Sequence, residues 1–287
     1  MHSDLGLTQN AVQTKIRSKL NSMPPFFSIV TVCLNAGAAL RQTAETVLAQ
    51  NFGDFEYIIK DGGSTDGSLD SLPRDPRIRI FRSPDCGIFD AMNQALEAAT
   101  GRFVHFLNAG DFFIDNDVLG DFESEIMHSE DTEFFYGDVI FPGLNREHVC
   151  YPGHLTRYFL FTHMICHQAW FVSRLAYLRL GKYKLDAKIG SDQVFLYDAL
   201  LGELIRYRHV PRFAVRYDIR GVSSNPAIQE QSRTFREGAR CRYYPSWERH
   251  IYSGLWKVRS LIRSLFILPP LLKIFRWLQR MRHGCNL

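Results

Sequence analysis

The chain has 287 residues, of which 46% are hydrophobic and 22% are charged, and its formal net charge is +4. This length and apolar content suit one large α/β domain or two small ones, and they exclude a disordered chain. The charge is unevenly placed. Eight Lys and Arg and no Asp or Glu lie from Arg249 to the C-terminus, which leaves about −4 for the first 248 residues.

Residues 1–25 are polar, lack the pattern of a signal peptide and end in Pro24-Pro25. We interpret them as an N-terminal extension with a short amphipathic helix over residues 11–20. The six cysteines form no CxxC pair and have no regular spacing. This disfavours a disulfide framework or a zinc knuckle, and it favours reduced thiols in a cytosolic protein.

From residue 26 the sequence alternates between β-branched or aromatic runs and helical patterns. Strands are predicted at 26–33, 55–60, 78–81 and 103–107, and helices at 40–50 and 88–101. A repeated β-α-β order predicts a doubly wound, mostly parallel sheet flanked by helices.

Acidic and glycine-containing segments follow two of these strands. Asp61-Gly62-Gly63 opens a loop with three glycines, where a ligand can approach the backbone and an acid can accept hydrogen bonds from a base or ribose. The fourth strand ends at Asn108 and Gly110, before Asp111. A carboxylate at this edge suits a hard cation that bridges phosphates. The alternatives are an Asp-Gly turn at Asp61 and a solvated turn at Asp111.

Beyond residue 112 the pattern is looser. A strand is predicted at 134–141, and Cys166-His167-Gln168 interrupts an apolar segment. Ser191 is a plausible N-cap of a helix reaching about Leu201, which would place Asp192 in its first turn. The helix dipole there favours an ionised acid that could serve as a base. A lone histidine such as His167 is more often a satisfied core residue.

The C-terminal segment interleaves apolar and basic residues, and Pro269-Pro270 divides it. No apolar run approaches the ~20 residues of a spanning helix. Basic, Trp-bearing amphipathic segments favour an in-plane helix pair on the anionic inner leaflet. The alternative is a helical hairpin packed on the catalytic domain with a solvated basic face. We expect no nucleic-acid partner, because no recognised motif accompanies the charge.

Six segments in this order resemble family 2 glycosyltransferases of the GT-A fold, which are inverting, nucleotide-sugar-dependent enzymes of bacterial polysaccharide assembly. The likeness is greatest to colanic-acid, exopolysaccharide and O-antigen transferases. The segments are Ser28-Ile29-Val30-Thr31-Val32-Cys33-Leu34-Asn35, Asp61-Gly62-Gly63-Ser64-Thr65-Asp66-Gly67, Pro84-Asp85-Cys86-Gly87-Ile88-Phe89-Asp90-Ala91-Met92-Asn93, Phe106-Leu107-Asn108-Ala109-Gly110-Asp111, His167-Gln168-Ala169 and Ser191-Asp192.

The resemblance implies roles for individual residues. Asp192 would be the catalytic base, Asp111 would bind Mg²⁺ or Mn²⁺, and His167 and Gln168 would contact acceptor or phosphate. Asn108 and Gly110 replace two of the acids usual in the family's metal motif. A loop at 221–223 would close over the donor diphosphate. The donor-binding residues would be Thr31, Cys33, Asn35, Asp61, Gly62, Asp85, Asp90, Asn93, Asn108 and Ala109.

The expected organisation is an extension over residues 1–25, a GT-A catalytic domain over 26–225 and a basic helical segment over 226–287. The catalytic domain would comprise a nucleotide-binding half (26–112) and an acceptor half (113–225). The expected function is transfer of a sugar from a nucleotide-diphospho-sugar, with UDP favoured, to a glycan or lipid-linked oligosaccharide acceptor. The expected location is cytoplasmic, peripheral on the inner face of the cell membrane.

Three alternatives are weighed against that function. A sugar nucleotidyltransferase normally has a Gly-rich, Arg-containing loop where this chain has Cys33-Leu34-Asn35-Ala36-Gly37. A dehydrogenase would have GxGxxG at the same turn. A catalytically silent scaffold in a polysaccharide assembly complex stays open, because the turn at Asp111 has one acid where the family's metal motif usually has two or more.

Overall fold

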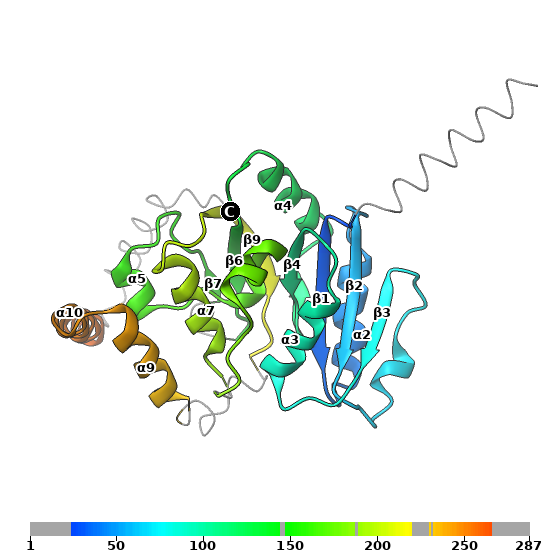
Figure 1. The fold of residues 1–287 in the computed structure, drawn as a ribbon, viewed down its shortest axis with the longest axis horizontal. Coiled ribbons are helices and arrows are strands. Elements are labelled where there is room, and N and C mark those ends of the chain that lie inside the picture. The colour runs from blue at the N-terminus through cyan, green and yellow to red at the C-terminus, as the bar shows by residue number, and fades with distance from the viewer. Residues whose placement is uncertain (1–23, 144–146, 187–188, 220–229, 231, 266–287) are drawn as a thin grey trace, which may run out of the picture.

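A single nine-stranded sheet organises the protein (Figure 1). The structure is a computed structural model that describes residues 24–143, 147–186, 189–219, 230 and 232–265. The strand order is β3-β2-β1-β4-β8-β6-β9-β5, and β7 pairs with β6. The strands are β1 (Phe27–Cys33), β2 (Phe55–Asp61), β3 (Ile78–Arg82), β4 (Phe103–Phe106), β5 (Phe112–Phe113), β6 (Phe134–Ile140), β7 (His148–Val149), β8 (Trp170–Ser173) and β9 (Tyr207–Arg216).

The sheet is mixed and mostly parallel, as predicted. β1 runs parallel to β2 and β4, β2 to β3, and β6 to β9. β8 is antiparallel to both of its neighbours, and β5 and β7 are antiparallel as well. Cys33 pairs with Asp61, and Asp61 pairs with Arg82, so the carboxyl ends of β1, β2 and β3 are level. This common edge is where open α/β sheets bind ligands.

Both faces of the sheet are buried, so the protein has three layers. Along β1, Val30 and Val32 belong to the core beneath α3, while Phe27 and Ile29 belong to the core beneath α2 and α4. This alternation follows from the two-residue period of a strand. The helices are α2 (Ala38–Leu48), α3 (Ile88–Ala98), α4 (Val118–Met127), α5 (Arg157–Thr162), α6 (Arg174–Leu180), α7 (Ser191–Leu200), α9 (Arg233–Tyr243) and α10 (Ser246–Leu265), with 3₁₀ turns η1 (Ser68–Ser71) and η2 (His167–Ala169).

The predicted strands and the helices beginning near residues 40, 88 and 191 are present, with boundaries that differ by a few residues. The predicted cap at Ser191 is wrong. Gly190 (φ 98°) occupies the N-cap, and Ser191 is the first helical residue. The segments predicted at 11–20 and 221–223 lie outside the described residues. Five of the six cysteines lie in the described ranges, and all five are free thiols.

The helices α9 and α10 lie at the end of the molecule farthest from β1, β2 and β3 (Figure 1). Arg157 of α5 fixes α10, because its Nε and Nη2 atoms donate to the two carboxylate oxygens of Glu248, each at 2.8 Å. Such a bidentate pair is directional as well as strong. None of the described helices has the length and hydropathy that a bilayer crossing requires.

Candidate active site

Two loops at the ends of β1 and β2 are bonded to each other. The Asn35 N–H donates to Ser64 Oγ at 2.8 Å, and the Thr65 N–H donates to Asn35 Oδ1 at 2.9 Å. Asp66 accepts from the Gly37 N–H at 2.8 Å. Asn35 has φ 51°, a left-handed conformation that Asn tolerates better than most residues. Asn35 therefore shapes this corner while remaining exposed at its surface.

Asp61 is fully buried beneath these loops. Its carboxylate accepts from the Ser64 hydroxyl and N–H and from the Gly63 N–H, and it lies 3.1 Å from Arg82 Nε. Burial raises the pKa of Asp61, but the Ser64 and Gly63 hydrogen bonds and Arg82 outweigh it, so the pKa is lowered. Burial also raises the pKa of the adjacent Cys33 thiol to about 12. Asp61 holds its own loop, and its contact with a base stays a prediction.

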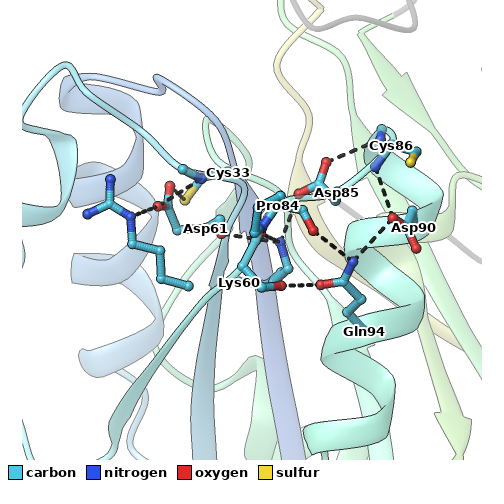
Figure 2. Close-up of polar contacts among 12 residues, drawn as sticks. Cys33, Lys60, Asp61, Pro84, Asp85, Cys86, Asp90 and Gln94 are labelled. Atoms are coloured by element: carbon cyan, nitrogen blue, oxygen red, sulfur yellow. Dashed lines mark hydrogen bonds and ion pairs between the residues drawn. The ribbon is translucent and has the colours of Figure 1, made fainter.

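Lys60 is a buried cation that the sequence reading did not single out (Figure 2). Its Nζ atom donates to Asp61 O at 3.2 Å, Ser83 O at 2.7 Å and Asp85 Oδ2 at 2.8 Å, so all three N–H groups have partners. A Cβ added to Gly62 would lie 2.7 Å from Asp85 Oδ2. Asp85 is therefore held against the Gly62 backbone, and a larger residue at position 62 would have to displace the Asp85 side chain.

Asp85 and Asp90 order the turn that enters α3 (Figure 2). Asp85 Oδ1 accepts from the Gly87 N–H at 3.2 Å. Asp90 Oδ2 accepts from the Cys86 N–H at 2.9 Å and from Gln94 Nε2 at 3.2 Å. The N-cap itself is Gly87, which has no side-chain cap. Each aspartate thus uses one oxygen to support the turn, and both are only partly buried at the sheet edge.

Two predicted donor contacts, Thr31 and Asn93, have their polar atoms taken up inside the fold. Asn93 Nδ2 donates to Tyr183 O at 2.9 Å, and Asn93 Oδ1 accepts from the Tyr183 N–H at 2.8 Å. Thr31 Oγ1 donates to Leu107 O at 2.6 Å and lies 2.9 Å from Tyr57 Oη. Asn93 is 5% exposed and Thr31 is fully buried. These hydrogen bonds give both residues a role in the fold, and a donor contact by either residue stays a prediction.

Asp111 lies in the turn between β4 and β5, directly before β5, and is 3% exposed. Gln168 Nε2 donates to its Oδ2 at 2.9 Å, and the Asp218 N–H donates to its Oδ1 at 2.8 Å. Thr43 fixes the turn, because its hydroxyl donates to Asp111 O and accepts from the Gly110 N–H, both at 2.9 Å. Burial raises the pKa of Asp111 to about 7, against the lowering effect of these two hydrogen bonds and His167.

His167 lies between the turn at Asn108 and the first turn of α7. Its Nδ1 atom is 3.4 Å from Asp192 Oδ2, and its Nε2 atom is 3.3 Å from Asn108 Nδ2. Asp192 Oδ1 accepts from the Gln193 N–H at 2.9 Å. The buried Asn108 Oδ1 has no hydrogen-bond partner among the described residues. The residues predicted for metal (Asp111), acceptor (His167) and base (Asp192) therefore lie close together, although they are distant in sequence. Ala109 lies in the same turn as Asn108.

Asp218 belongs to this cluster and was missed in the sequence. It follows β9 by two residues. A Cβ added to Gly110, which has φ 101°, would lie 2.9 Å from Asp218 Oδ2. The signal in the sequence was weak, because Asp218 lies inside the basic, strand-like stretch from Arg206 to Arg220. Asp218 is thus a second carboxylate beside Asp111. The turn itself supplies no second acid, because it has Asn108 and Gly110 at the other positions.

The residues present fit a divalent cation that is bound together with a ligand. The described residues contain no group of three potential ligands that could hold a metal alone. Each oxygen of Asp111 accepts one hydrogen bond from the chain, and a carboxylate oxygen has a second lone pair. The raised pKa indicates a carboxylate whose charge the chain leaves under-compensated. Mg²⁺ commonly takes one or two carboxylates and draws its other ligands from phosphate and water.

Comparisons with known proteins agree with this geometry. The family model described as Glycosyl transferase family 2 matches residues 28–146. The PGL/p-HBAD biosynthesis glycosyltransferase of Mycobacterium bovis (strain BCG / Pasteur 1173P2) is 32% identical over 214 residues, which cover 72% of this chain and 82% of that protein. The chain belongs to glycosyltransferase family 2. The family match spans the loops after β1 and β2 and the Asp111 turn, and the longer alignment extends beyond them.

Three further matches either cover less of this chain or have lower sequence identity. The putative teichuronic acid biosynthesis glycosyltransferase TuaG of Bacillus subtilis (strain 168) is 36% identical over 97 residues, which cover 32% of this chain and 38% of TuaG. S. aureus TarS 1-349 in complex with UDP-GlcNAc has a TM-score of 0.54 at 17% identity, with 67% of this chain and 58% of that chain covered. The mannosyltransferase PcManGT from Pyrobaculum calidifontis, solved with GDP-Man and Mn2+, has a TM-score of 0.54 at 15% identity. The match covers 69% of this chain and 58% of that chain. These two structures support the fold of the glycosyltransferase.

Proposed function

We propose that this glycosyltransferase is an inverting enzyme that transfers a sugar from a UDP-sugar to a lipid-linked glycan acceptor in the synthesis of a bacterial surface polysaccharide. The observation that carries the proposal is the single cluster of Asp111, His167 and Asp192. This cluster has a buried carboxylate, which would serve the donor side, and a more exposed carboxylate, which would serve the acceptor side.

The loops after β1 and β2 and the turn after β3 form the proposed donor corner, which would hold the diphosphate and nucleoside. The exposed Asn35 and the partly buried Gly62 lie in these loops. Asp111, with Asp218 beside it, would hold Mg²⁺ or Mn²⁺. The cation would supply Lewis-acid stabilisation of the charge that develops on the departing nucleoside diphosphate. Gln168 and the Asp218 N–H orient Asp111 for this task.

Asp192 is proposed as the general base. Its side chain is 20% exposed, so it is reachable by an acceptor hydroxyl, and His167 Nδ1 and the Gln193 N–H restrict its orientation. The carboxylate takes the hydroxyl proton as the acceptor oxygen attacks the anomeric carbon. One displacement with the leaving group on the opposite side inverts the anomeric configuration.

The names of similar proteins support the substrate classes. The mycobacterial relative and TuaG are named for the synthesis of PGL/p-HBAD and teichuronic acid, respectively. TarS and PcManGT were solved with UDP-GlcNAc and GDP-Man. UDP is favoured here on the resemblance and on the TarS complexes.

The proposal is tested by donor screening followed by transfer. UDP-, GDP- and dTDP-sugars are screened with Mn²⁺ for a rise in melting temperature, because a ligand that binds only the folded state stabilises it. The stabilising donor is then used in transfer assays with Asp192→Asn. We expect turnover to fall about 10²–10⁴-fold while donor binding is kept. Asp198→Asn, on the same helix, is the matched control, and near-normal turnover of Asp192→Asn would refute the assignment.

The scaffold alternative makes a different prediction. A silent protein would hydrolyse none of the common donors, whereas an enzyme would slowly release nucleoside diphosphate in a reaction that needs metal and Asp111. Product stereochemistry, read by NMR of the new linkage, tests inversion separately.

The proposal includes an anionic membrane surface as a partner, bound by α10. Five apolar residues, each three or four residues from the next, form one face of this helix, and they are 48–64% exposed: Trp247, Ile251, Leu255, Val258 and Ile262. The helix instead contacts the body through Glu248 and Tyr252, which packs near Tyr158 and Phe161. A surface helix normally buries its apolar face. Basic residues accompany this stripe and no acid follows Glu248, which suits anionic lipid.

Vesicle flotation tests this contact. The full chain should float with phosphatidylcholine vesicles containing phosphatidylglycerol, less so with pure phosphatidylcholine, and less at high salt. The double variant Ile251→Asp/Val258→Asp should remain at the bottom. Leu175→Asp/Leu178→Asp, which changes two equally exposed leucines of α6, is the control. A wild-type chain that ignores the vesicles, or a concentration-dependent dimer that Ile251→Asp/Val258→Asp dissociates, would refute the membrane assignment.

A further inference from the structure

We propose that a basic pocket between α5, α7 and α9 binds the phosphate or pyrophosphate group of the acceptor. The pocket has a volume of about 340 Å³. It is lined by Thr162, His163, Met164, Gln193, Arg233, Arg236, Glu237 and Arg240. The inference rests on the proposed function, and it specifies the chemical class of the acceptor: a glycan attached through phosphate.

The pocket adjoins the proposed base. Gln193, which lines it, directly follows Asp192 in the first turn of α7. The start of α9 is tied to the start of α7, because the Ile189 N–H donates to Ser232 Oγ at 3.2 Å. A Cβ added to Gly190 would lie 2.9 Å from Arg236 Cγ, so that arginine lies against the residue that opens α7. An acceptor whose anionic group is bound here has its sugar within reach of Asp192.

The pocket has an excess of positive charge. Arg233, Arg236 and Arg240 are spaced by three and four residues, so they lie on one side of α9. Two acids offset part of this charge: Glu237, in the lining, accepts from Arg240 Nη1 at 2.6 Å, and Glu230 Oε1 lies 3.4 Å from Arg233 Nη1. Arg240 Nη2 donates to Phe161 O at 3.2 Å, while its buried Nε atom has no partner among the described residues. Planar guanidinium groups match phosphate oxygens in pairs, so several arginines around a cavity suit phosphate or pyrophosphate.

The position of the pocket favours the acceptor over the donor. The donor corner is at the ends of β1, β2 and β3, whereas α9 is at the other end of the molecule (Figure 1). The helix that follows α9 is α10, with its exposed apolar stripe. A lipid-linked pyrophosphate has an anionic group beside an apolar chain, and this pair of helices offers a matching pair of surfaces.

Calorimetry with inorganic pyrophosphate tests the pocket directly. In metal-free buffer, pyrophosphate should bind wild type with and without excess UDP, and Arg233→Ala/Arg236→Ala should weaken binding on the order of tenfold or more. Arg242→Ala, on the same helix but outside the pocket lining, is the matched control. Equal binding by wild type and the double variant overturns the proposal. Displacement of pyrophosphate by UDP also overturns it, because the anion would then occupy the donor site.

Acceptor kinetics distinguish a lipid-linked pyrophosphate from free phosphate. In Arg233→Ala/Arg236→Ala the KM for a polyprenyl-pyrophosphoryl glycan should rise on the order of tenfold, while kcat and the KM for the same glycan without phosphate stay unchanged. Equal changes for both acceptors, or no change for either, would refute an acceptor role. Asp192→Asn should still bind pyrophosphate, so loss of transfer and loss of the pocket are separate results.

Discussion

Two regions lie at the same edge of the sheet: the proposed donor corner, and a cluster of Asp111, His167, Asp192 and Asp218, here called the acid cluster. They differ in how their charged groups are paired. At the donor corner, Lys60 has three acceptors, and hydrogen bonds lower the pKa of Asp61 despite its burial. In the acid cluster, burial raises the pKa of Asp111, and Asn108 Oδ1 lacks a partner among the described residues. The chain completes the first region by itself, whereas the second has unsatisfied groups that a ligand and cation can satisfy.

The largest effect on stability is expected at the donor corner. Lys60→Met leaves Asp85 without its buried cation and Ser83 O without the donor that Lys60 supplies, while Asp61 O keeps the hydrogen bond from the Ser83 N–H. We expect the free energy of unfolding to fall by about 3–5 kcal/mol. Urea denaturation measures this. Lys182→Met, which removes an exposed pair with Glu97, is the control and should cost about 1 kcal/mol or less. Similar losses for the two variants would contradict the role given to Lys60.

Asp111→Asn should reduce turnover strongly and stability little, in contrast to Lys60→Met. Turnover should fall on the order of a hundredfold, because several kcal/mol of leaving-group stabilisation are lost. The free energy of unfolding at pH 8 should fall little, because removal of a charge that burial disfavours offsets the loss of one of the two hydrogen bonds that the carboxylate accepts. Metal-dependent transfer and urea denaturation measure the two quantities. Asp115→Asn, which changes an exposed carboxylate paired with Arg212, is the control. A variant that loses stability but keeps turnover would reverse the comparison.

Asn93→Ala distinguishes a structural residue from a donor contact. It leaves the buried N–H and C=O of Tyr183 unpaired, so the free energy of unfolding should fall by about 1–3 kcal/mol. UDP affinity, measured by calorimetry at a temperature where the variant is folded, should stay within about twofold. A large loss of UDP affinity with unchanged stability would restore the donor role suggested by the resemblance.

His105 gives a smaller, pH-dependent effect. It stacks between Phe113 and Phe171, and burial lowers its pKa from 6.5 to about 3. Between these values the unfolded chain binds the proton and the folded chain does not, so stability is lost as pH falls. The slope is at most about 1.4 kcal/mol per pH unit. His105→Gln removes this contribution, and the difference between the two denaturation series from pH 6.5 to 4 measures it. Parallel series would contradict the prediction.

The sequence predicted the first half of the fold well because strand and helix periods are local properties. The runs at 26–33, 55–60 and 103–107 became β1, β2 and β4 with few changes. The elements after residue 112 were read less completely. β5 and β7 have two residues each and exist through pairing with β9 and β6, which no local pattern reveals.

The candidate site was predicted in part for the same reason. Asp111, His167 and Asp192 were singled out individually, and the structure brings them together. Asp218 was missed because its proximity to Gly110 depends on how β9 crosses the sheet. Asn93 has the right position in the motif, but its amide pairs with a backbone 90 residues away. Lys60 was overlooked because a lysine in a strand is usually expected to be exposed. Its acceptors lie at the end of β2 and in the turn after β3, and a local pattern does not show that they meet.

The ion pair between Arg157 and Glu248 has a geometric consequence for a membrane-bound enzyme. It joins α10 to the catalytic body through Glu248, which lies next to the apolar stripe on the helix surface, so the stripe belongs to a helix fixed to the body and not to a tethered tail. On a bilayer, such a helix fixes both the tilt of the protein and the height of Asp192 above the lipid headgroups. The enzyme would then select acceptor sugars by their distance from the membrane surface.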